Sequence, residues 1–117
     1  MLLSLPELIQ QTTGDVRTLD IDSARGEIAE NNGVLIDVRE AAEVSNMPTP
    51  ATAAIPRGVL EIKITELAPA HDTPIYLHCA SGGRARLCAA QLSRMGYTNV
   101  TAVTCPADKI CLSFNEG

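Results

Sequence analysis

Aromatic side chains are scarce in this 117-residue chain, which has no tryptophan, one phenylalanine and two tyrosines. Any core must therefore be built from aliphatic side chains. Basic residues are also in the minority: nine lysines and arginines stand against fourteen aspartates and glutamates, giving a formal net charge of −5 at pH 7. Because contacts to phosphates need clustered lysine and arginine, this balance argues against nucleic acid as the main partner.

Long apolar runs are missing as well, since no stretch approaches the roughly 18 consecutive apolar residues of a membrane-spanning helix. Residues 1–11 are briefly apolar, but Pro6 and Glu7 interrupt them, and neither a basic leader nor a small-residue cleavage site accompanies them. We interpret residues 1–15 as an N-terminal helix and not as a signal peptide. We therefore expect a cytoplasmic protein without a membrane partner.

The cysteines lack the spacing of a metal site. Cys79, Cys88, Cys105 and Cys111 contain no C-x-x-C pair, and the two histidines do not cluster with them. We therefore expect neither a metal nor another cofactor. A chain of this length buries about two-thirds of its extended surface on folding and does not need disulfides. We expect reduced thiols, with Cys88 in the core and Cys111 packed or idle.

The sequence does contain short apolar runs that alternate with helix signals over a single domain, residues 1–117. We predict strands at 16–19, 34–36, 75–78 and 100–103, and helices at 5–13, 22–30, 40–44, 58–67, 84–95 and 107–112. Ser4 and Asp22 are the expected N-caps of the first two helices. The alternation implies an α/β fold, with a mostly parallel sheet and helices on both faces. Ligands of such sheets bind at the carboxyl ends of the strands, where Asp37 and Cys79 fall.

Residues 78–85, HCASGGRA, carry the most chemical information. Cys79 ends a buried strand, Gly82 and Gly83 form a tight turn, and a helix begins at once. Because glycine tolerates positive φ, successive N–H groups can converge into a nest, to which the helix N-terminus adds donors. Such a nest, closed by the fixed positive charge of Arg84, would favour an exposed Cys79 thiolate and hold an oxyanion or a persulfide. The alternative is a structural cysteine followed by an ordinary turn.

Four segments, in this order and at this separation, resemble a single-domain rhodanese, which is a sulfurtransferase. They are residues 35–40 (LIDVRE), residues 54–61 (AIPRGVLE), the Cys79 loop and residues 95–100 (MGYTNV). The resemblance covers about residues 20–104 and implies a three-layer domain around a five-stranded parallel sheet. We count four strands, so a short one near Ala53 would complete it. The proline-rich loop at 46–56 lacks the G-H-I-P-G-A stretch of many relatives, and residues 105–117 are a short, atypical C-terminal segment.

The resemblance also implies a reaction. Cys79, which matches the nucleophile, would accept a sulfane sulfur from a donor such as thiosulfate or a persulfide. It would pass that sulfur to an acceptor such as cyanide or a thiol, and a protein could serve as donor or acceptor. Backbone amides of the matching loop would hold the persulfide. The loop residues are Ala80, Ser81, Gly82, Gly83 and Arg84. Because this loop has no interior lysine or arginine, we predict modest activity with thiosulfate.

Two other functions stay open. Phosphatases related to rhodanese resemble H-C-x-x-x-x-x-R, whereas this chain has His78 and Cys79 but one residue fewer between Cys79 and Arg84. The shorter loop favours sulfur over phosphate, so a phosphatase or arsenate reductase on the same fold is the weaker alternative. The other alternative is a non-catalytic sulfur carrier or protein-binding module. We expect His78 itself to be a partnered strand histidine and not a catalytic base.

Outside the loop, the candidates for supporting roles are Asp37, Arg39, Arg57 and Cys105. Asp37 either orients the loop region or caps a turn. Arg39 is expected to pair with a carboxylate such as Glu43, and Arg57 could line the mouth of the site. Cys105 either packs as a small residue or, if it lies near Cys79, resolves an oxidised Cys79 as a disulfide.

Overall fold

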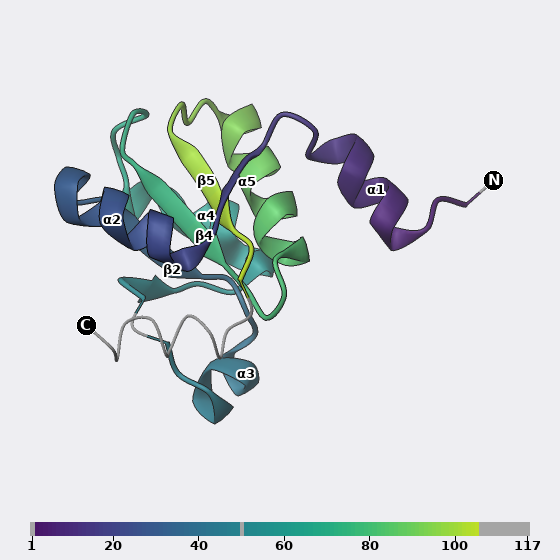
Figure 1. Ribbon diagram of the computed structural model, residues 1–117, viewed down its shortest axis with the longest axis horizontal. Coiled ribbons are helices and arrows are strands. Elements are labelled where there is room, and N and C mark those ends of the chain that lie inside the picture. The colour runs from purple at the N-terminus through teal and green to yellow at the C-terminus, as the bar shows by residue number, and fades with distance from the viewer. Residues whose placement is uncertain (1, 50, 106–117) are drawn as a thin grey trace.

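The computed structural model describes residues 2–49 and 51–105. Five strands form one parallel sheet in the order β1-β5-β4-β2-β3, and helices lie on both faces (Figure 1). The strands are β1 (Arg17–Leu19), β2 (Val34–Asp37), β3 (Ala53–Ala54), β4 (Ile75–His78) and β5 (Val100–Val103). The helices are α1 (Leu5–Thr12), α2 (Ile21–Asn31), α3 (Ala41–Asn46), the 3-10 turn η1 (Arg57–Val59), α4 (Leu60–Leu67) and α5 (Gly83–Met95). The predicted α/β class is confirmed.

The fifth strand lies where the resemblance required one. In β3, Ala53 pairs with Ile36 and Ala54 pairs with Asp37 of β2. A strand of two residues is too short for any periodic pattern, which explains why the apolar runs alone indicated four. The predicted helix 107–112 and Cys111 lie outside the described residues. Among the helices of residues 2–49 and 51–105, none has the length and apolar character needed to cross a membrane.

Side chains cap the first two helices. The Ser4 hydroxyl accepts a hydrogen bond from the Glu7 N–H at 3.3 Å, and the Glu7 carboxylate accepts one from the Ser4 N–H at 3.1 Å, as predicted. For α2 the prediction was wrong, because Asp20 and not Asp22 is the N-cap. Its Oδ1 accepts from the Ser23 N–H at 2.8 Å. The helix follows β1 so closely that Asp22 already lies in its first turn.

The core occupies both faces of the sheet, because side chains of successive strand residues point to opposite faces. In β4, Ile75 and Leu77 pack with α4 and α5, whereas Tyr76 packs with α2. All three are at most 1% exposed, and each buried aliphatic side chain contributes roughly 1.5–3 kcal/mol. Cys79, two residues beyond Leu77, therefore falls on the face that α4 and α5 cover.

The predicted N-terminal helix forms as α1, but its apolar side chains stay largely uncovered. Leu5 is 63% and Leu8 is 43% exposed, and α1 contacts the domain through α5. Figure 1 shows the helix projecting from the body of the protein. A helical period identifies the residues that share a face, but it does not say what covers them.

Candidate functional site

Asp37 and Cys79 lie at the carboxyl ends of two neighbouring strands. Asp37 ends β2 and Cys79 follows β4 directly, and these two strands pair with each other. From β2 the chain continues to β3 on one side of the pair, and from β4 it continues to β5 on the other. Ligands of parallel sheets bind at such a reversal of strand order. The structure thus places both residues where a site was predicted.

Two backbone N–H groups converge on the Cys79 sulfur. The Gly82 N–H donates to Sγ at 3.0 Å, and the Ala85 N–H, in the first turn of α5, donates at 3.4 Å. Donors that point at one sulfur from a turn and from a helix N-terminus stabilise negative charge on it. Gly82 was among the predicted loop residues, whereas Ala85 was missed. Its place in the first turn of a helix, where N–H groups lack helical partners, was the signal that could have found it.

The Cys79 side chain is buried, which corrects the expectation of an exposed sulfur. Cys79 is 1% exposed and packs in the cluster that contains Val38, Ala85 and Cys88. The cause is geometric, because a turn that brings amides within hydrogen-bond distance of the sulfur also closes over it. Of the other loop residues, Ser81 is exposed, and Ala80, Gly83 and Arg84 are half-buried. A reagent can reach Sγ only after the surrounding groups move.

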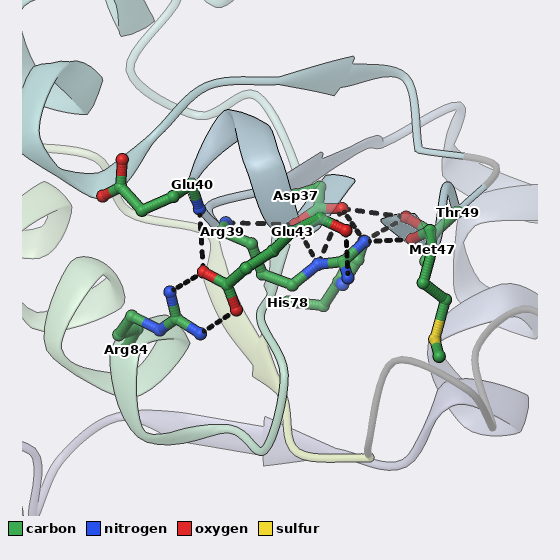
Figure 2. A network of polar contacts seen from close by, with 8 residues as sticks. All are labelled: Asp37, Arg39, Glu40, Glu43, Met47, Thr49, His78 and Arg84. Atoms are coloured by element: carbon green, nitrogen blue, oxygen red, sulfur yellow. Dashed lines mark hydrogen bonds and ion pairs between the residues drawn. The ribbon is translucent and has the colours of Figure 1, made fainter. Parts of the chain in front are cut away.

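A buried ion pair joins the end of β2 to the turn that follows it. Arg39 Nη2 donates to Asp37 Oδ2 at 2.7 Å, and Arg39 Nε donates to Oδ1 at 3.0 Å. The side chains are 3% and 1% exposed. Arg39 pairs with a carboxylate, as predicted, but that carboxylate belongs to Asp37 and not to Glu43, which supplies its backbone carbonyl and accepts from Nη1 at 3.3 Å. The Met47 carbonyl accepts from Nη2 at 2.6 Å, so Arg39 ties α3 to the sheet (Figure 2).

Thr49 connects this ion pair to His78. Its hydroxyl donates to Asp37 Oδ2 at 3.1 Å and lies 2.9 Å from His78 Nε2. Because a hydroxyl carries one hydrogen, the hydroxyl that donates to Asp37 accepts from Nε2–H, which assigns the tautomer of His78. Burial lowers the pKa of His78, and the Asp37 carboxylate opposes that shift only in part. His78 is therefore a neutral, partnered strand histidine, as predicted.

Asp37 stays ionised at the centre of this network. Burial alone would raise the pKa of Asp37, but the hydrogen bonds and the positive charge of Arg39 hold it below its usual value. Its oxygens bind groups on both sides, Arg39 before α3 and Thr49 after it. Asp37 fills both of the roles considered for it: its Oδ1 accepts from the Arg39 N–H at 3.1 Å, which caps the turn after β2, and its contacts with Arg39 and Thr49 orient the surrounding loops.

Arg84 does not offer an unpaired charge to the Cys79 loop. Its Nη1 and Nη2 donate to Glu43 Oε1 and Oε2 at 2.6 and 2.8 Å (Figure 2). The expected positive charge is present beside the loop, but it is paired with a carboxylate. The reason lies in the topology: α3 follows β2 and α5 follows β4, so two neighbouring strands bring the partners together. Hydrogen bonding to Arg84 lowers the pKa of Glu43 to about 2.

Arg57 and Cys88 line a cavity that is separate from the Cys79 loop. With Glu61 they line a cavity of about 200 Å³ between α1, α4 and α5. No residue of the 79–84 loop is part of its lining. Cys88 is buried, as expected, and burial raises the pKa of its thiol to about 12. The role of Arg57 at the mouth of the Cys79 site stays a prediction.

Cys105 packs on the opposite face of the sheet from Cys79. It belongs to the cluster under α2, and its Sγ accepts from the Ile21 N–H at 3.3 Å. Cys79, Cys88 and Cys105 are all free thiols. These contacts favour the interpretation of Cys105 as a packed small residue, and its role in resolving an oxidised Cys79 stays a hypothesis.

Two residues that shape the site were not predicted in these roles. Thr49 lies in the proline-rich loop, where no local pattern marks it. Glu43 was assigned to Arg39. The sequence did contain a signal for Glu43, since a glutamate three residues after an N-cap is typical of a capping box. In the structure Glu40 is that N-cap, and its N–H donates to Glu43 Oε1 at 3.1 Å. This contact helps to hold the Glu43 carboxylate where Arg84 reaches it.

Comparison with known proteins finds a domain family that matches the part of the chain containing these residues. A family model described as the rhodanese-like domain matches residues 20–105. A protein named sulfurtransferase, from Allochromatium vinosum, is 30% identical over 86 residues, which cover 73% of this chain and 78% of that protein. Both the Asp37 network and the Cys79 loop fall inside the matched residues.

Solved structures share the fold at lower identity. A polysulfide-sulfur transferase homodimer from Wolinella succinogenes matches with a TM-score of 0.72 and 24% identity, over 87% of this chain and 77% of that one. A protein of unknown function from Rhodopseudomonas palustris, described as a possible tyrosine phosphatase, matches with a TM-score of 0.82 and 18% identity, over 97% and 93%. At these identities the likeness concerns the fold alone.

Proposed function

The chain belongs to the rhodanese-like domain family, and from this premise we propose that it is a sulfurtransferase that carries a sulfane sulfur on Cys79. One observation carries the proposal: the N–H groups of Gly82 and Ala85 both point at Cys79 Sγ. Such donors stabilise negative charge on the sulfur that attacks the sulfur donor. They are also placed to stabilise the persulfide anion until an acceptor arrives.

The chemistry takes two steps when thiosulfate is the donor. The Cys79 thiolate attacks the outer sulfur of thiosulfate, an Sγ–S bond forms, the S–S bond of thiosulfate breaks, and sulfite leaves with the electron pair. Cyanide then attacks the outer sulfur of the persulfide, thiocyanate leaves, and the electron pair returns to Sγ as thiolate. No proton is transferred in either step, so the cysteine needs no general base.

The range of donors and acceptors belongs to the proposal. We take thiosulfate or a persulfide as the donor and cyanide or a thiol as the acceptor, and either partner could be carried by a protein. The free thiols of Cys79, Cys88 and Cys105 suit a reducing compartment, so we place the reaction in the cytoplasm.

A phosphatase is the second candidate, because the Rhodopseudomonas palustris protein described as a possible tyrosine phosphatase shares the fold over nearly the whole chain. Two observations weigh against it. The loop from Cys79 to Arg84 is one residue shorter than the phosphatase pattern, and the arginine that would bind a phosphate is held by Glu43. A sulfur carrier without turnover is the third candidate.

Intact-mass spectrometry after treatment with thiosulfate tests the proposal. We expect the wild type to gain about 32 Da, the mass of one sulfur atom, as a persulfide. Cyanide should remove this mass, and Cys79→Ser should not gain it. A persulfide that a reducing thiol removes, in a protein that shows no thiosulfate:cyanide turnover, would identify a carrier. An unmodified wild type that hydrolyses p-nitrophenyl phosphate through Cys79 would instead identify a phosphatase.

Gly82→Ala is expected to weaken both the loop and the reaction. Gly82 has φ +102°, and a Cβ on it would lie 3.2 Å from Thr104 Cα and 3.3 Å from the Thr104 carbonyl oxygen. An alanine can relieve this contact only by moving its own N–H, which now holds Sγ. We expect a loss of about 1–3 kcal/mol in the free energy of unfolding, measured in urea, and a several-fold fall in thiosulfate:cyanide turnover.

Gly96→Ala is the matched control, because Gly96 has φ +114° but nothing lies within 4 Å of its added Cβ. It carries the same backbone strain at the far end of α5. We expect the Gly96→Ala variant to lose free energy of unfolding, while its folded form transfers sulfur at the wild-type rate. Equal turnover in both variants would contradict a role for the Gly82 N–H.

A further inference from the structure

The Arg84–Glu43 ion pair spans the carboxyl edge of the two central strands, beside the Cys79 loop. Arg84 belongs to the first turn of α5, directly after that loop, and Glu43 belongs to α3, which follows β2. Figure 2 shows the guanidinium and the carboxylate facing each other through two parallel contacts. The side chains are 32% and 36% exposed, so solvent and small anions can reach the pair.

Glu43 is held in this place from three directions. Its carboxylate accepts from Arg84 and from the Glu40 N–H, and its backbone carbonyl accepts from the buried Arg39. The carboxylate stays ionised well below neutral pH, because the hydrogen bonds from Arg84 and from the Glu40 N–H lower the pKa of Glu43 to about 2. A negative charge is therefore built into the edge of the site and cannot be removed by ordinary changes of pH.

Arg84 lies next to a backbone amide that binds the Cys79 sulfur, because the following residue, Ala85, donates its N–H to Sγ at 3.4 Å. Hydrogen bonding to Glu43 raises the pKa of Arg84, which stays cationic. Within residues 79–84 it is the one cationic side chain. With Glu43 bound, this cation is neutralised. An anionic donor that approaches Cys79 finds the Arg84 guanidinium already occupied and meets a fixed carboxylate, which it must displace to bind Arg84.

We propose that Glu43 is a specificity-determining residue, which selects against doubly charged sulfur donors such as thiosulfate in favour of donors that carry one negative charge. The inference rests on the proposed sulfur transfer and adds the charge class of its donor. A second negative charge on the donor is repelled by Glu43, while the interaction that would attract it, with Arg84, is already taken. Glu43 acts on donor binding and makes no bond to the transferred sulfur.

Two donors that react alike but differ in charge provide the test. Thiosulfate carries two negative charges, and benzenethiosulfonate carries one. In both, the Cys79 thiolate attacks the terminal sulfur and the S–S bond breaks, so that sulfite or benzenesulfinate leaves with the electron pair and the same persulfide forms. The measurement is kcat/KM for each donor with cyanide as acceptor, in wild type and in Glu43→Gln, which keeps the shape and one hydrogen-bond acceptor for Arg84.

We expect Glu43→Gln to raise kcat/KM for thiosulfate by about tenfold relative to benzenethiosulfonate at low salt, mainly through a lower KM. The gain should shrink at high ionic strength. Glu30→Gln removes the same charge from an exposed residue near the end of α2, beside the amino end of β2, and should leave the ratio unchanged. If Glu43→Gln does not fold, the same ratio of kcat/KM values for the two donors can be measured in Glu43→Ala.

Equal changes for both donors, or a lower preference for thiosulfate, would show that the pair only stabilises the fold and would overturn the inference. Failure of the proposed function gives a different result, in which the wild type forms no persulfide with either donor. If Glu30→Gln changed the ratio of the two kcat/KM values as much as Glu43→Gln, the effect would come from the net charge of the protein. That result would also overturn a specific role for Glu43.

Discussion

Cys79→Ser is expected to reduce thiosulfate:cyanide sulfur transfer by at least about a thousandfold, because a hydroxyl can neither form nor hold the persulfide. The fold should be unaffected, since serine is close to cysteine in size and the Gly82 and Ala85 N–H groups that now bind Sγ can bind Oγ. The measurement is steady-state thiocyanate formation, with circular dichroism to confirm folding.

Cys88→Ala is the control for this loss. Cys88 is a second buried thiol, 2% exposed, on the same face of the sheet, and burial raises its thiol pKa to about 12. A thiol that stays protonated at neutral pH is a poor nucleophile, so we expect turnover to remain within a few-fold of wild type. Activity that survives Cys79→Ser but disappears in Cys88→Ala would transfer the nucleophilic role to α5.

Asp37→Ala has the largest expected effect on stability. The substitution leaves the Arg39 guanidinium, 3% exposed, without its carboxylate in the core. Removing one partner of a buried ion pair typically costs about 3–5 kcal/mol, and here it also removes the acceptor of the Thr49 hydroxyl. We expect urea denaturation to show a loss in this range and a disturbed loop between α3 and β3.

Arg17→Ala serves as the comparison, because Arg17 and Glu27 form an ion pair whose side chains are 44% and 35% exposed. Exposed pairs contribute about 1 kcal/mol or less. If Asp37→Ala cost no more than Arg17→Ala, the buried network would not be what ties α3 to the sheet.

Local patterns predicted most of the fold. Each of the correctly predicted elements depends on residues that are close together in the sequence. They are the Ser4 cap, the strands β2, β4 and β5, and the helix α5. The Cys79 nest could be predicted for the same reason, because a glycine turn followed by a helix gathers N–H groups without help from distant parts of the chain.

Contacts between distant segments could not be predicted in this way. Arg84 and Glu43 are 41 positions apart, and their meeting depends on which strands are neighbours. For Arg39, the carboxylate chosen from the sequence was the wrong one. Glu43 lies four positions further on, which is the spacing of neighbours on a helix, but α3 begins only after Arg39. Asp37, two residues back, is its carboxylate partner. Thr49 joins Asp37 and His78 only because the proline-rich loop folds over the end of β2.

The near-complete burial of the Cys79 sulfur, at 1% exposure, has a consequence for the lifetime of the enzyme. Thiolates that face solvent are converted by peroxide to sulfenic acid and then irreversibly to sulfinic and sulfonic acids. A sulfur enclosed by main-chain amides meets such oxidants rarely. The same enclosure thus shields the resting thiol from oxidative inactivation.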